Sequence, residues 1–166
     1  MIDMKDLFSK ISSHDLFVNL FPGVIFAVIS EKVTAYSFLQ KDIVIGFFVY
    51  YLIGLMLNSF GSVVLKPFLM WVGISEEYTE YCEFISACKM DTKIELLSEK
   101  NNMYLTLSSL FALLIILKFW EWSVSFHPVL KEYGTSLLLL FLMIVFVLSY
   151  KKQTNYIKER IKESKK

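Results

Sequence analysis

The stretch IVIGFFVYYLIGLMLNSFGSVVL, residues 43–65, runs for twenty-three positions without a charged side chain. A helix rises about 1.5 Å per residue, so about 20 apolar residues cross the ~30 Å hydrocarbon layer of a bilayer. This stretch is long enough and predicts a membrane-spanning helix. Three further apolar runs occupy residues 16–30, 101–117 and 133–150. We therefore expect an integral membrane protein with four spans.

The composition agrees with this interpretation. Apolar residues make up 55% of the chain and fifteen positions are Phe, more than a small soluble domain can bury. Residues 16–30 form the weakest span because they hold Asn19 and Pro22, so we expect this helix to be short or bent. The predicted fold class is an all-α membrane protein, with residues 1–166 as one membrane domain.

The distribution of Lys and Arg predicts the orientation, because these residues collect on the cytoplasmic side of membrane proteins. With four spans, the N-terminal segment, residues 66–100 and the tail carry thirteen of them, and the other two loops carry four. Both termini are therefore expected in the cytoplasm. Before position 16 three aspartates outnumber two lysines, unlike the basic start of a signal peptide, so we expect no cleavage.

Two cytoplasmic elements are predicted. Residues 71–100 form a helical insertion, with Ser75 as the N-cap of a first helix and Asp91 as the N-cap of a second that continues into the third span. We expect a hairpin over residues 75–100. Residues 151–166 form a basic tail, which suits anionic lipid headgroups. An approximate heptad seam in this tail favours either assembly or a solvated helix end.

Catalytic and metal-binding patterns are missing from the sequence. Cys82 and Cys88 match no zinc spacing, and His14 and His127 fall on opposite sides of the predicted membrane. There is no nucleotide-binding glycine loop, no serine elbow and no pair of intramembrane carboxylates. We expect no enzyme activity, no cofactor and no metal.

One face of the second span is small and polar. Gly54, Asn58, Gly61 and Ser62 follow each other at helical spacing. Such a face serves either as a packing seam between helices, the commoner case, or as the lining of a pore. The lining requires several copies around an axis, because four helices of one chain leave no central hole.

Ligand or partner contacts are expected on the cytoplasmic side. The candidates are aromatic residues of the insertion and cations of the tail: Tyr78, Tyr81, Lys151, Lys152, Lys158 and Arg160. Cations of this kind bind lipid headgroups or the phosphates of a nucleic acid.

Several motifs carry a resemblance to known proteins. They are Ile53-Gly54-Leu55, Ser59-Phe60-Gly61-Ser62, Lys66-Pro67, Tyr81, Phe84, Ala87, Lys89, Asp91, Leu97-Ser98-Glu99 and Asn101-Asn102-Met103-Tyr104. Together they resemble a family of small bacterial four-span membrane proteins, over about half of the chain. Family members often carry an arginine after that tyrosine, where this chain has Leu105, so a cation at the membrane entrance is missing here.

In size and layout the chain is similar to the channel subunit of the Hailong antiphage system, and secondly to the membrane subunit of the Kiwa system. The resemblance implies an oligomeric ion channel of the bacterial inner membrane that short DNA keeps shut and infection opens. Expected partners are then the lipid bilayer, further copies of the chain in a tetramer, a short single-stranded DNA and a cytoplasmic defence protein. The alternatives are a noncatalytic sensor or scaffold and, last, a lipid-directed enzyme.

Overall fold

The computed structural model describes residues 16–76, 81–127 and 129–163, and all regular elements in these ranges are helical. The elements are the π-helical turns η1 (Leu16–Leu20) and η2 (Gly61–Leu65) and the α-helices α3 (Phe21–Val33), α4 (Ile43–Phe60), α5 (Lys66–Trp71), α6 (Tyr81–Met90), α7 (Thr92–Phe126) and α8 (Val129–Glu163). The all-helical prediction is confirmed.

Three helices are long and apolar enough to cross a membrane: Ile43–Trp71, Thr92–Phe126 and Val129–Lys162. The first is continuous through α4, η2 and α5, and the others are α7 and α8. They contain three of the four predicted apolar runs, so a multi-pass membrane protein is supported. The remaining run, residues 16–30, lies in η1 and α3. This segment does not belong to the three helices above. A crossing by this segment stays a prediction.

Aspartates begin two of the long helices. The Asp42 carboxylate accepts hydrogen bonds from the backbone N–H groups of Val44 at 2.8 Å and Ile45 at 3.0 Å. Asp91 accepts from Lys93 N–H at 2.9 Å, and α7 begins at Thr92, as the sequence predicts. Each carboxylate satisfies N–H groups that have no partner inside the helix and favours the positive end of its dipole.

The predicted start of a helix at Ser75 is wrong. Helix α5 ends in a Schellman motif, in which Gly73 N–H donates to Met70 O at 3.0 Å and Ile74 N–H to Leu69 O at 2.9 Å. Gly73 adopts the left-handed conformation that this motif needs, with φ 80°. Ser75 therefore lies in the exit from α5 rather than at a helix start, and α6 begins at Tyr81.

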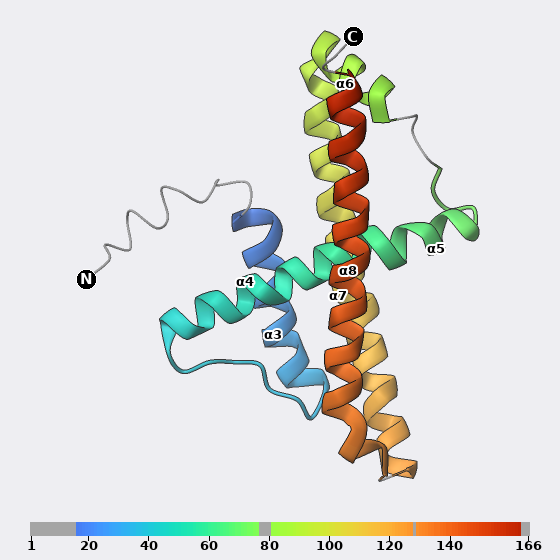
Figure 1. Ribbon diagram of the computed structural model, residues 1–166. Helices are drawn as coiled ribbons and strands as arrows, with labels where there is room; N and C mark the ends of the chain where they lie inside the picture. Colours follow the sequence, from blue (N-terminus) through green and yellow to red (C-terminus); the bar gives the residue numbers. More distant parts are fainter. Residues whose placement is uncertain (1–15, 77–80, 128, 164–166) are drawn as a thin grey trace.

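The long helices cross rather than form a simple bundle. Figure 1 shows α7 and α8 side by side and antiparallel, with α4 running across them near their middle and α3 packed against α4. The core lies at this crossing and consists of Phe26, Leu57, Phe60, Leu110, Leu113, Leu114 and Val145. Side chains from four helices thus meet at one level of the α7–α8 pair.

Helices α7 and α8 are longer than a membrane requires. Each has 35 residues and is about 52 Å long, well over the ~30 Å of hydrocarbon. The surplus is polar and lies at the end that holds the start of α7 and the C-terminal part of α8, which we call the tail end. Helix α6 packs there against both helices (Figure 1).

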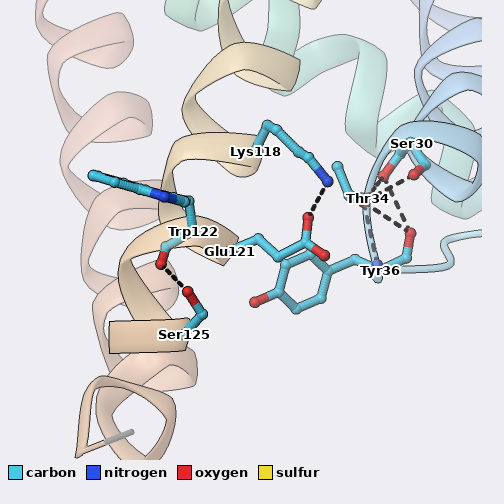
Figure 2. Close-up of polar contacts among 7 residues, drawn as sticks. All are labelled: Ser30, Thr34, Tyr36, Lys118, Glu121, Trp122 and Ser125. Atoms are coloured by element: carbon cyan, nitrogen blue, oxygen red, sulfur yellow. Dashed lines mark hydrogen bonds and ion pairs between the residues drawn. The ribbon is translucent and has the colours of Figure 1, made fainter. Parts of the chain in front are cut away.

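The opposite end, where α7 leads into α8, is the loop end. Figure 2 shows its polar contacts, which include the Lys118–Glu121 ion pair at 2.9 Å. The end of α3, drawn in the same view, is closed by Thr34, whose N–H and hydroxyl both donate to Ser30 O, at 2.9 and 2.8 Å. Both donors of Thr34 thus bind the same carbonyl in the last turn of α3.

Candidate functional site

Three asparagine amides form a chain where α4 crosses its neighbours. Asn58 Nδ2 donates to Asn19 Oδ1 of η1, and Asn102 Nδ2 of α7 donates to Asn58 Oδ1, both at 3.4 Å. Asn19 is only 5% exposed. An amide without a partner is costly in apolar surroundings, so the three side chains stabilise one another. Both distances are long for hydrogen bonds between amides.

Glycines bring the backbones of these helices together. A Cβ at Gly54 would overlap the backbone carbonyl of Asn19, and a Cβ at Gly61 would overlap the hydroxyl of Ser109. Both glycines are buried. A larger side chain at Gly54 would therefore force the helices apart, and one at Gly61 would require the Ser109 side chain to move.

Ser62 connects the same region to α8. Lys152 Nζ donates to Ser62 O at 2.9 Å and to Ser62 Oγ at 2.6 Å. We use the name polar layer for these two groups together: the amides of Asn19, Asn58 and Asn102, and the Ser62–Lys152 pair one helical turn further along the second span.

The structure thus brings the four predicted residues of the second span to one place. Gly54 and Asn58 lie against η1 and α7, and Gly61 and Ser62 lie against α7 and α8. All four make close contacts or hydrogen bonds within the chain. A role in a pore stays a prediction.

Both π-helical turns precede a proline. Helix α3 follows η1 and has Pro22 as its second residue, and α5 follows η2 and has Pro67 as its second residue. Proline lacks an N–H and clashes with the carbonyl four residues earlier, so the preceding turn departs from regular α-helical hydrogen bonding. Asn19 lies in η1 and Ser62 in η2. Turns of this kind are frequent at functional sites.

The predicted contact residues of the cytoplasmic side are separated. Tyr78 and the side chain of Tyr81 lie outside the described residues. Lys151, Lys158 and Arg160 are exposed on the part of α8 at the tail end. Lys152 is half-buried at Ser62, and its ammonium also lies 5.6 Å from the ring centroid of Tyr156.

Sequence reasoning missed the partners of the second-span face. A signal was available for Asn19 and Asn102, since each is an amide within a predicted apolar run. Lys152 gave no such signal, because it is one of several cations in the basic tail. The pairing with Ser62 depends on how α8 packs against η2.

A small hollow of about 170 Å³ lies beside the layer, between α5 and α7. Its lining includes Lys66, Ser75 and Tyr104. Ser75 Oγ is buried and has no hydrogen-bond partner within the described part of the chain. That part also holds no group of three or more His, Cys, Asp or Glu residues that could bind a metal ion.

No known protein family, curated protein or solved structure matches this chain. Its function is therefore inferred from the polar layer and from the helices that carry it.

Proposed function

We propose that this chain is the membrane subunit of a homo-oligomeric ion channel of the bacterial inner membrane, with both termini in the cytoplasm. In this proposal it is an effector of antiphage defence that depolarises the membrane when it opens. The main support for the channel is the polar layer, in which one group of hydrogen bonds joins η1, α4 and α7 and a second joins η2 and α8.

Polar side chains are costly in hydrocarbon unless they have partners, so a cluster of them between membrane helices serves either packing or conduction. Polar groups that face the interior of a bundle or a water-filled cavity can line paths for ions and substrates.

The outward face of α8 supports an oligomer. In the most apolar 18-residue window of each long helix, 22% of residues are buried for Ile43–Trp71, 28% for α7 and 6% for α8. Helix α8 is thus the span with the most surface left for lipid or for another copy. Because the few spans of one chain pack without a central hole, we assign the pore to a ring of copies, with a tetramer as the working arrangement.

The gating ligand is proposed to be anionic. Lys151, Lys158 and Arg160 are exposed near the end of α8 and offer cations to phosphate groups. Short single-stranded DNA is the ligand that the resemblance implies. We propose that it binds these cations from the cytoplasm and keeps the channel closed.

Ion flux into liposomes containing the purified full-length protein tests the proposal. We expect flux that short oligodeoxynucleotides suppress, and an altered flux in Asn58→Leu, because leucine removes the central amide of the layer. Asn155→Leu is the matched control, since it makes the same chemical change at an exposed position of α8.

Each other outcome has a distinct meaning. Equal flux for Asn58→Leu and wild type, at equal abundance in the membrane, would remove Asn58 from the conduction path. Flux that DNA leaves unchanged would keep the channel and discard the ligand. No flux from folded protein in any condition would discard the channel.

A noncatalytic sensor or scaffold is the second candidate. It is favoured by the tail end, where α6 packs against α7 and α8 beyond their apolar parts. Met90, at the end of α6, is 91% exposed and available to a cytoplasmic defence partner. On this hypothesis the protein alone leaves ion flux unchanged, and Met90→Lys disrupts partner binding without changing the stability of the fold.

A further inference from the structure

The Ser62 carbonyl lacks the donors that a helix normally supplies. In α-helical geometry its partner is the N–H of Lys66, four residues later, but that group donates to Gly61 O. In π-helical geometry its partner is residue 67, which is Pro67 and has no N–H. The proline therefore opens a gap at Ser62 in the hydrogen bonding of the long helix Ile43–Trp71.

A gap of this kind needs a partner from elsewhere. A backbone carbonyl without a partner costs several kcal/mol in hydrocarbon, where water is scarce. Lysine has three N–H donors on a flexible stem, and Lys152 directs its ammonium at both oxygens of Ser62. The hydroxyl of Ser62 completes the pair of oxygen acceptors beside the open carbonyl.

We propose that the two oxygens of Ser62 form an ammonium-binding site opened by Pro67, and that Lys152 is the latch that occupies it. The latch joins α8 to η2 within the long helix Ile43–Trp71. It lies next to the exposed cations of the tail, so a ligand that moves this part of α8 moves the latch as well. The link to gating rests on the proposed channel, whereas the latch itself does not.

Restoring the missing N–H provides a direct test. Pro67→Ala supplies a backbone donor at the position from which π-helical geometry reaches Ser62 O. We therefore expect Lys152→Met to lower Tm by about 3–6 °C when residue 67 is proline, and by clearly less in the Pro67→Ala background. Tm is measured for the purified full-length protein in lipid nanodiscs.

Two further variants keep the test decisive. Lys151→Met removes the neighbouring exposed cation and should leave Tm unchanged. Ser62→Ala removes only the hydroxyl acceptor and should lower Tm by less than Lys152→Met. If Lys152→Met does not fold, Ser62→Ala can be compared in the Pro67 and Pro67→Ala backgrounds instead. Equal effects of Lys151→Met and Lys152→Met, or a Lys152→Met effect that Pro67→Ala does not reduce, would overturn the latch.

The gating link is read from liposome flux in the same variants. We expect Lys152→Met to weaken the suppression of flux by oligodeoxynucleotides at least tenfold in the concentration required. If the effect of Lys152→Met on Tm depends on Pro67 but no variant gives ion flux, the latch is kept and the channel is discarded. If Lys152→Met gives flux that DNA suppresses normally, the gating link is discarded. If there is flux but the effect of Lys152→Met on Tm does not depend on Pro67, the channel is kept and the latch is discarded.

Discussion

The loop end and the polar layer use polar side chains in opposite ways. At the loop end the contacts are local: Lys118 pairs with Glu121 three residues later, and Ser125 Oγ donates to Trp122 O at 2.6 Å (Figure 2). In the polar layer, Asn58 forms hydrogen bonds with Asn19 and Asn102, which are 39 and 44 positions away in the sequence.

The difference separates two functions of polarity in this protein. A local contact satisfies polar groups of its own helix. It therefore places no requirement on which helix packs beside it. A contact between residues far apart in the sequence requires that two particular helices meet at a particular height. Lys152 reaches Ser62 across 90 positions, so it adds α8 to the set. The layer is therefore where polar chemistry decides which helices are neighbours.

The largest expected effect comes from preventing the layer from assembling. Gly54→Ala places a Cβ against the carbonyl of Asn19, which is backbone and cannot rotate away. We expect the free energy of unfolding to fall by about 3 kcal/mol, or no folded protein at all. Thermal unfolding in nanodiscs measures the change.

The control is Gly134→Ala in α8. There the nearest atom to a new Cβ is Trp120 Cζ2 at 3.5 Å, an ordinary contact, and alanine is the better helix former. This variant should be as stable as wild type or slightly more. Gly54→Ala and Gly134→Ala with the same stability would show that α4 does not approach η1 as described.

A smaller effect is expected from breaking the amide chain. Asn58→Ala and Asn102→Ala should each lower the free energy of unfolding by about 1 kcal/mol, with a coupling energy of about 0.6 kcal/mol in a double-mutant cycle. The estimate is modest because the hydrogen bond is 3.4 Å long. Asn155→Ala, at an exposed position, is the control. Strictly additive losses would show that the two amides do not interact.

The smallest effect is expected at the loop end. Lys118→Met removes an ion pair whose side chains are 59% and 29% exposed, so solvent already screens most of the interaction. We expect a loss of about 0.3 kcal/mol or less. Glu121→Gln should have the same small effect. A loss above about 1 kcal/mol from either variant would mean that this local pair also holds helices together, and the contrast between the two regions would fail.

Part of this architecture could be predicted from local sequence. The apolar runs at 43–65, 101–117 and 133–150 lie within the three long helices. They could be predicted because the length and hydropathy of a segment can be read without knowing what it packs against. The start of α7 after Asp91 was also accessible, since a cap acts on the next residues of its own chain. Ser75 failed as a cap because the Schellman motif of α5 already determines the path of the chain there.

The sequence by itself determined which segments are helical and membrane-compatible, and which face of the second span is small and polar. These properties follow from hydropathy, capping and helical period, which act over a few residues. Only the tertiary structure decided that this face meets Asn19, Asn102 and Lys152. Helical period assigns a residue to a face, but the neighbour of that face depends on how the helices cross. Here α4 crosses α7 and α8 instead of running alongside them (Figure 1).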